Sequence, residues 1–290
     1  MTNFNQINKY HTIVIFLLSL FFLTLDIEAQ KSSIAIICFF LIATIGVSHG
    51  SLDHLKGDKL LRIFKIKSKL LFYFVYIFSA LIVMCSWVVF PLFTLVMFLI
   101  VASHHFGIED SVFGKIKKLK FSGLFLFLKG SIVILAPLYF HPYETIEIFK
   151  ILNLKLDQYN NNLIIFLISL SLISNFYINK NILLSLLDSF TVIILNINFE
   201  PLLAFTIYFC FLHSIRHSLS LIQDINNRDF KKGFIGFLKK ALPLTIITAF
   251  SFLIAMFLLN EYYLLESAIL KVVFIGLASL TFPHILLEYL

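Results

Sequence analysis

The stretch PLLAFTIYFCFLHSIRHSLSLIQ, residues 201–223, is apolar enough to cross a membrane, yet it carries two histidines one helical turn apart. Positions i and i+4 share one face of a helix, so His213 and His217 can reach a single cation while Arg216 points elsewhere. Ionisable side chains are costly inside a membrane and by default mark a working site. This stretch therefore predicts a membrane-spanning helix that contributes to a functional site.

The composition extends the membrane prediction to the whole chain. Hydrophobic residues make up 60% of the 290 residues, charged residues make up only 13%, and the mean hydropathy is +0.96. A soluble domain of this size would carry roughly twice that charged fraction. The three cysteines lie in apolar runs without CxxC spacing, which favours neither a disulfide framework nor a thiolate metal site. We expect a single all-α integral membrane domain over residues 1–290.

Apolar runs of about 20 residues predict a polytopic bundle of about ten transmembrane helices, with about eight to ten as the range. The predicted spans are 12–27, 33–51, 70–90, 91–108, 121–140, 161–178, 182–199, 201–223, 241–260 and 266–288. The break between the third and fourth spans rests on Pro91. The first span has little positive charge before it and no small-residue cleavage site after it, so we interpret it as a membrane helix rather than a signal peptide.

Basic residues predict how the bundle is oriented. Six lie between residues 56 and 69, four between 115 and 120, and five between 228 and 240, all on one side if the spans alternate. The opposite loops are poor in basic residues or acidic, as at Asp26 and Glu28. The positive-inside rule therefore predicts that both termini are cytoplasmic. The net charge of +7 follows from this topology and from anionic lipid headgroups, so it gives no reason to expect nucleic acid as a partner.

Most of the nine histidines fall near the cytoplasmic ends of four predicted spans, those near 33–54, 91–110, 201–223 and 266–288. They are His49, His54, His104, His105, His213, His217 and His284. A single histidine near a helix end is usually an interfacial residue. Because four helices deliver histidines to one depth, we predict a shared metal site toward the cytoplasmic side. Imidazole suits iron, zinc, copper or nickel better than magnesium or calcium, and the spacing leaves the metal open.

The residues beside these histidines refine the predicted site. Gly50 would let a backbone or a ligand approach closely. Asp53 comes four residues after His49, so it shares the same face if the helix continues, and it would orient an imidazole as a hydrogen-bond acceptor. Of the adjacent pair His104 and His105, whose directions differ by about 100°, we expect only one to face the site.

Four motifs follow one another along the chain. They are Gly-x-x-His-Gly-x-x-Asp from Gly46, His-Phe-Gly-x-x-Asp from His105, Tyr-Phe-x-x-x-His-Ser-x-x-His from Tyr208, and Pro-His at Pro283. As an ordered set, they resemble the Brp/Blh family of membrane-bound β-carotene 15,15'-dioxygenases. The resemblance implies an enzyme of the cell (inner) membrane that cleaves the central double bond of β-carotene with O2. The products would be two molecules of all-trans-retinal, commonly the chromophore of a microbial rhodopsin.

The resemblance also implies a non-haem Fe(II) ion, whose ligands correspond to His49, His105, His213 and His217. Four neutral imidazoles would leave the +2 charge of the iron intact. Asp53 and Asp110 are then expected to be hydrogen-bond partners of the ligands. Further candidates for tuning the metal or contacting the substrate are His54, His104, Glu109, Tyr208 and His284. The phenylalanine-rich interior would supply an apolar surface for the polyene.

Other interpretations of the histidines remain. A di-iron desaturase or hydroxylase typically carries HxxHH boxes, and this sequence has no HxxHH. A metal transporter would distribute polar groups near the bilayer midplane in internal repeats, which we do not find. A non-enzymatic membrane protein that binds carotenoid is a third alternative, because ligands can persist without turnover. Lys129, a cation inside the fifth span, is expected to snorkel to the cytoplasmic face or to pair with Asp53 or Asp110.

Overall fold

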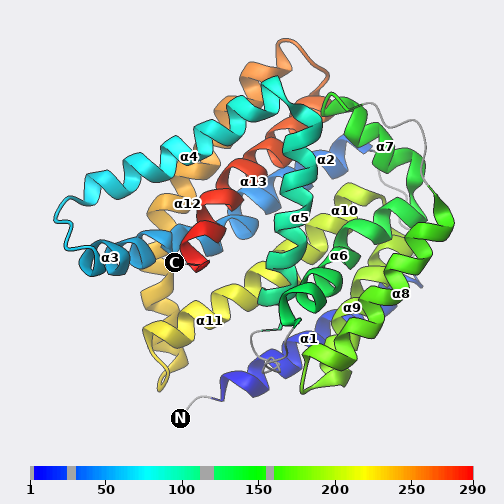
Figure 1. The fold of residues 1–290 in the computed structure, drawn as a ribbon, viewed down its shortest axis with the longest axis horizontal. Helices are drawn as coiled ribbons and strands as arrows, with labels where there is room; N and C mark the ends of the chain where they lie inside the picture. The colour runs from blue at the N-terminus through cyan, green and yellow to red at the C-terminus, as the bar shows by residue number, and fades with distance from the viewer. Residues whose placement is uncertain (1–2, 25–30, 112–120, 155–159, 290) are drawn as a thin grey trace.

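The chain folds into an all-α structure, seen in a computed structural model that describes residues 3–24, 31–111, 121–154 and 160–289 (Figure 1). The side chains of Lys31 and His49 lie outside this description. In chain order the helices are α1 (Phe4–Phe22), α2 (Lys31–Leu41), the π-helical turn η1 (Ile42–Gly46), the 3-10 turn η2 (Ser48–Leu52), α3 (Asp53–Ile63), α4 (Lys69–Val89), α5 (Pro91–Glu109), α6 (Ser122–Phe140), α7 (Pro142–Ile151), α8 (Asn161–Ile178), α9 (Ile182–Asn198), α10 (Pro201–Ile207), the π-helical turn η4 (Tyr208–Ser214), α11 (Ile215–Ile225), α12 (Phe230–Asn260) and α13 (Leu265–Tyr289).

Within the described residues, 8 helical segments are long and apolar enough to cross a membrane. The all-α prediction is therefore confirmed, and the length and composition of these segments fit a multi-pass membrane protein. The 8 segments lie at the lower end of the predicted range of about eight to ten. Two of the ten predicted spans are not among them: α1 is absent from the 8 segments, and α9, with 17 residues, is shorter than they are.

Two helices begin well before the predicted spans, and a third helix was not predicted. α1 begins at Phe4 rather than at 12. α7 follows Pro142 directly and corresponds to no predicted span. α12 begins at Phe230 rather than at 241, because Asp229 caps it by accepting a hydrogen bond from the backbone N–H of Lys232. Four of the basic residues between 228 and 240 therefore lie on a helix and not in a loop.

The predicted orientation depends partly on charged residues that the structure does not describe. Asp26, Glu28 and the four basic residues between 115 and 120 lie outside the described residues. The basic residues between 56 and 69 lie on α3, in the turn that follows it and at the start of α4. The cytoplasmic location of both termini stays a prediction.

Two of the predicted spans are interrupted where they approach each other. The span predicted at 33–51 consists of α2, η1 and η2, and the one at 201–223 consists of α10, η4 and most of α11. Ser214 of η4 donates a hydrogen bond to the backbone carbonyl of Gly46 in η1, at 3.0 Å. π-Helical turns inside helices are frequent at functional sites, and η4 carries His213.

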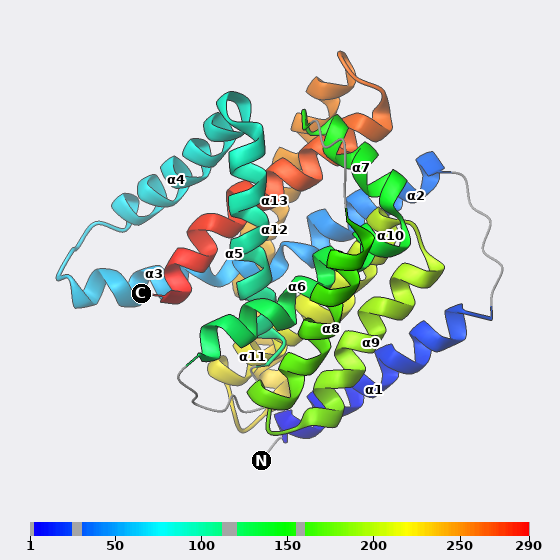
Figure 2. The same cartoon turned by 45° about the vertical axis from the view of Figure 1, so that its right-hand side comes forward.

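The helices that carry most of the described histidines lie in the middle of the molecule. In both views α1, α8 and α9 lie together beyond α6, whereas α4 lies at the opposite edge (Figures 1 and 2).

A Cβ on Gly107 of α5 or on Gly130 of α6 would lie 1.9 Å from a backbone oxygen of the other helix. Glycine at both positions lets the two backbones approach. This contact fixes the last turns of α5, which carry His105 and Glu109.

Candidate metal centre

Four buried histidines meet between α5, η4, α11 and α13. They are His105, His213, His217 and His284, called here the histidine cluster. The ring centroid of His105 lies 5.3 Å from that of His213 and 5.3 Å from that of His284. The rings of His217 and His284 are 5.5 Å apart. Segments far apart in the sequence therefore bring four imidazoles into one cluster of neighbouring rings.

Buried carboxylates hold two of these rings from behind. The Nδ1 of His284 lies 2.8 Å from Asp53 Oδ1, and the Nδ1 of His217 lies 2.5 Å from Glu109 Oε2. An Nδ1–H group that donates to a carboxylate leaves Nε2 as the nitrogen with a lone pair, which is the usual arrangement around metal-bound histidines. These two rings are therefore oriented as ligands of a metal would be.

Asp110 follows the end of α5 and lies between His213 and a buried arginine. Its Oδ1 is 3.6 Å from His213 Nδ1 and 3.3 Å from Arg216 Nη1. Tyr208 donates a hydrogen bond to its Oδ2 at 2.7 Å. Burial alone would raise the pKa of Asp110, but the contact with His213 and the charge of Arg216 outweigh burial and lower this pKa. Asp110 therefore stays ionised beside His213.

Arg216 lies on the far side of Asp110 and, as the helical spacing predicts, points away from the cluster. Its side chain is fully buried, and its Nη2 donates to Asp188 of α9 at 2.7 Å. Nη2 also donates to Thr12 at 3.0 Å, and Nε donates to Asn8 at 3.1 Å, so α1 contributes two of the acceptors. A buried guanidinium requires such partners, because an uncompensated charge in a protein interior is expensive. The network ties α1 and α9 to the helix that carries His217.

Lys129 is buried, and it does not contact Asp53. Its ammonium group donates to the backbone carbonyl of Asp110 at 2.9 Å and to the hydroxyl of Ser111 at 2.8 Å. The expected pairing with Asp110 is therefore a contact with its backbone and not with its carboxylate. Lys129 consequently fixes the chain at the end of α5, next to the histidine cluster.

The remaining predicted residues take different positions. Of the adjacent pair, His105 enters the cluster, whereas His104 hydrogen-bonds through Nδ1 with the hydroxyl of Tyr289. His54 is half-buried, with its Nδ1 2.9 Å from the carbonyl of Ser51. The backbone of His49 lies in η2, and its side chain is outside the described residues.

The helix that would align Asp53 with His49 does not continue. The chain passes through the 3-10 turn η2 before α3 begins at Asp53. The Asp53 carboxylate contacts His284, and Tyr76 of α4 donates to its Oδ2 at 2.8 Å. A Cβ on Gly50 would lie 3.9 Å from His284 Nδ1, so this glycine lies directly beside the Asp53–His284 pair.

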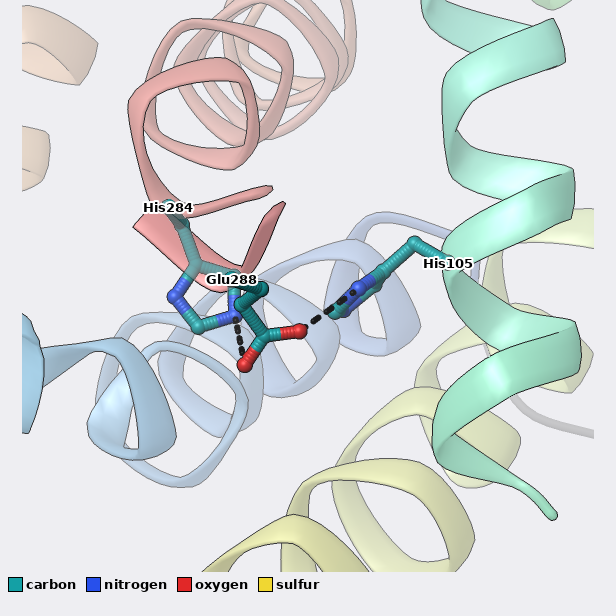
Figure 3. A group of neighbouring side chains, drawn as sticks. All are labelled: His105, His284 and Glu288. Carbon is teal, nitrogen blue, oxygen red and sulfur yellow. Dashed lines mark ion pairs between the residues drawn. The ribbon is translucent and has the colours of Figure 1, made fainter. Parts of the chain in front are cut away.

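Glu288 was not among the predicted site residues, yet it lies against the histidine cluster. Its Oε2 is 3.5 Å from His105 Nδ1, and its Oε1 is 3.9 Å from His284 Nε2. Figure 3 shows the carboxylate between these two imidazole rings. Lys56 of α3 forms an ion pair with Oε1 at 2.5 Å. The one sequence signal for Glu288 is that it follows His284 by four residues, on the same helical face.

An apolar cavity of about 380 Å³ lies beside the cluster. Its wall includes Phe72, Tyr76 and Ala80 of α4, Phe209 of η4, and His284. α4 covers the cavity from the outer edge of the bundle, and most of its apolar side chains are exposed, as lipid-facing residues are. An apolar ligand in this cavity would reach the histidine cluster without crossing water.

Comparisons with known proteins agree with this arrangement. Residues 40–290 match the family model described as "Beta-carotene 15,15'-dioxygenase". The chain is 29% identical over 267 residues to the "Beta-carotene 15,15'-dioxygenase" of uncultured marine bacterium 66A03, an alignment that covers 85% of this chain and 90% of that protein. No solved structure matches the chain. The family model covers most of the sequence, including every residue of the histidine cluster, and the chain belongs to the β-carotene 15,15'-dioxygenase family.

Proposed function

We propose that this chain cleaves β-carotene at its central 15,15' double bond with O2 and releases two molecules of all-trans-retinal. The cofactor is a non-haem Fe(II) ion, and its ligands are His49, His105, His213 and His217. The observation that carries the proposal is the buried histidine cluster, backed by carboxylates and bordered by an apolar cavity. Membership of the β-carotene 15,15'-dioxygenase family supports the same reaction.

The donor set fits iron. Imidazole nitrogens bind iron, whereas magnesium and calcium prefer oxygen ligands. The Nδ1 atom of His217 is engaged by Glu109 and that of His213 lies near Asp110, so their Nε2 atoms are the donors that a metal would meet. When bound, the iron supplies the activation of O2.

The protein residues bind and orient the substrate. β-Carotene is a long uncharged polyene, so it partitions into the hydrocarbon of the membrane and can enter from the side of α4. Phe72 and Phe209 supply apolar walls for the polyene, and the small side chain of Ala80 takes up little of the cavity that they line. The buried cluster and its apolar surroundings exclude water from the reacting bond. Retinal is also apolar and can return to the lipid.

The same proposal includes the location and partners of the enzyme. It is a multi-pass protein of the cell (inner) membrane, with both termini and the metal centre toward the cytoplasm. Membrane lipid surrounds it and dissolves its substrate. A microbial rhodopsin that takes retinal as its chromophore is its functional partner.

Expression of the full chain in a bacterium that accumulates β-carotene tests this function. We expect the culture to lose its orange colour and retinal to appear in extracts. His213→Ala should abolish both effects and lower the bound iron. Persistent colour in well-expressed, iron-supplemented cells would favour the non-enzymatic carotenoid-binding alternative, and longer apocarotenals in place of retinal would move the cleavage position.

A further inference from the structure

We propose that Glu288 is a carboxylate ligand of the metal, so that the centre is a mixed histidine and carboxylate site. The inference rests on the iron centre proposed above, and it changes the donor set that the resemblance implies. Glu288 lies in the last turn of α13 and belongs to two groups of residues that could hold a metal ion, one with His105 and His284 and one with Glu109 and His217.

The distances allow one ion to touch the carboxylate and the imidazoles. Glu288 Oε1 lies 3.9 Å from His284 Nε2 and 4.0 Å from His217 Nε2, and Oε2 lies 3.5 Å from His105 Nδ1. A first-row metal ion roughly 2.1 Å from each donor spans donors up to about 4.2 Å apart. All three separations are below that limit, so Glu288 can share an ion with each of these histidines.

The orientation of the imidazoles supports the same assignment. Asp53 engages Nδ1 of His284, and Glu109 engages Nδ1 of His217, so both rings direct Nε2 toward the Glu288 carboxylate. Glu288 Oε1 lies within 4.0 Å of both Nε2 atoms, on the side of each ring opposite its own carboxylate partner. The positions of the nitrogens around Glu288 therefore indicate a metal ligand.

Lys56 holds the carboxylate in place from the other side. The ion pair between Lys56 Nζ and Glu288 Oε1 is 2.5 Å long. The side chain of Lys56 is 32% exposed and that of Glu288 is 15% exposed, against 5% for His105, so the pair forms the rim of the cluster.

A carboxylate ligand changes the chemistry of the centre. Histidines alone would leave the full +2 charge of Fe(II), whereas one added carboxylate lowers the formal charge of the centre to +1. The ligand field also changes, because an oxygen donor is harder than an imidazole nitrogen. Both effects are measurable by metal affinity and spectroscopy, without turnover.

The test uses the full chain in lipid nanodiscs, titrated with Co(II) as a spectroscopic probe and with Fe(II) under anaerobic conditions. Glu288→Gln keeps the shape of the side chain but removes its charge. We expect the Kd for both metals to rise about 10–100-fold or more, since even residues that only contact ligands have effects of about that size. The Co(II) absorption bands should also shift. Glu266→Gln, a matched change near the other end of α13, should leave the Kd values and the Co(II) bands unchanged.

Lys56→Gln separates a ligand from an ion-pair partner. If Glu288 binds the metal, Lys56→Gln has a smaller effect than Glu288→Gln and leaves the Co(II) bands near the wild-type position. Equal effects of the two variants with unshifted bands overturn the inference, as does wild-type affinity in Glu288→Gln. If Glu288→Gln does not fold, the Co(II) spectrum of Glu288→Asp is measured instead. We expect its bands to be shifted from those of the wild-type chain, and an unshifted spectrum overturns the inference.

Failure of this inference differs from failure of the iron centre. If the wild-type chain binds neither metal, or if the His213→Ala variant binds both metals as well as the wild-type chain does, the proposed iron centre is refuted. If metal binding is lost in His213→Ala but unchanged in Glu288→Gln, only the assignment of Glu288 as a ligand is refuted.

Discussion

Replacement of Glu109 tests whether buried carboxylates orient the metal ligands. Glu109 Oε2 lies 2.5 Å from His217 Nδ1, and both side chains are buried. A hydrogen bond to a carboxylate is roughly twice as strong as one between neutral groups. Glu109→Gln keeps an acceptor at this position, so we expect the iron affinity to fall about tenfold, whereas Glu109→Leu removes the acceptor and should cost about 100-fold. These factors correspond to about 1.4 and 2.8 kcal/mol of binding free energy.

The assay is competition for Fe(II) between the full chain and a chelator, with iron per chain measured after desalting. Glu144→Gln is the matched control, because Glu144 lies 4.0 Å from His141 Nδ1 but outside the histidine cluster. We expect wild-type iron affinity for this control. If Glu109→Leu also bound iron with wild-type affinity, the role assigned to the carboxylates would be refuted.

Three further changes address the cavity and the buried charges. Tyr76→Phe removes the hydrogen-bond donor to Asp53 and should lower the iron affinity by less than about tenfold. A higher iron affinity, or an unchanged iron affinity together with unchanged turnover, would contradict a link between Tyr76 and the metal centre. Ala80→Leu narrows the cavity and should raise KM for β-carotene by roughly tenfold with normal iron content; an unchanged KM argues that substrate binds elsewhere. Asp188→Ala leaves buried Arg216 without its closest carboxylate and should cost about 3 kcal/mol of stability. Thermal unfolding of the purified chain measures this loss, and an unchanged unfolding midpoint would contradict the prediction.

The sequence predicted those parts of the site that depend on local spacing. His213 and His217 both enter the histidine cluster, and of adjacent His104 and His105 only His105 does, as the difference of about 100° between their directions predicts. The contact between Arg216 and Asp188 joins residues of different helices, and no pattern along the chain encodes it. Packing between helices produces such contacts, so the sequence pattern does not predict this one.

The end of α13 contributes more residues to the site than the sequence pattern predicts. His284 appeared only as a lesser candidate, because a lone Pro-His pair carries no ligand spacing of its own. Glu288 was missed because an acidic residue at the end of a membrane span is usually an interfacial side chain. The structure brings both to the histidine cluster through contacts with Asp53 and Lys56, which come from α3.

The fold was predicted well where apolar runs have sharp ends and less well where charge interrupts a helix. Pro91 separates α4 from α5 as expected. α12 starts earlier than predicted, because the Asp229 cap and tertiary packing outweigh the charges of Lys231 and Lys232, which resembled a loop. The π-helical turn at Tyr208–Ser214 has no recognised sequence signal and became visible only in the structure.

The most direct test of the central claim is the product of the purified chain. The full chain is loaded with Fe(II) in lipid nanodiscs and given β-carotene and O2, and the products are quantified by chromatography. We predict two molecules of retinal for each β-carotene consumed, with no product from His213→Ala or from the iron-free chain. Longer apocarotenals as the main product, or cleavage that persists without iron or without His213, would contradict the account.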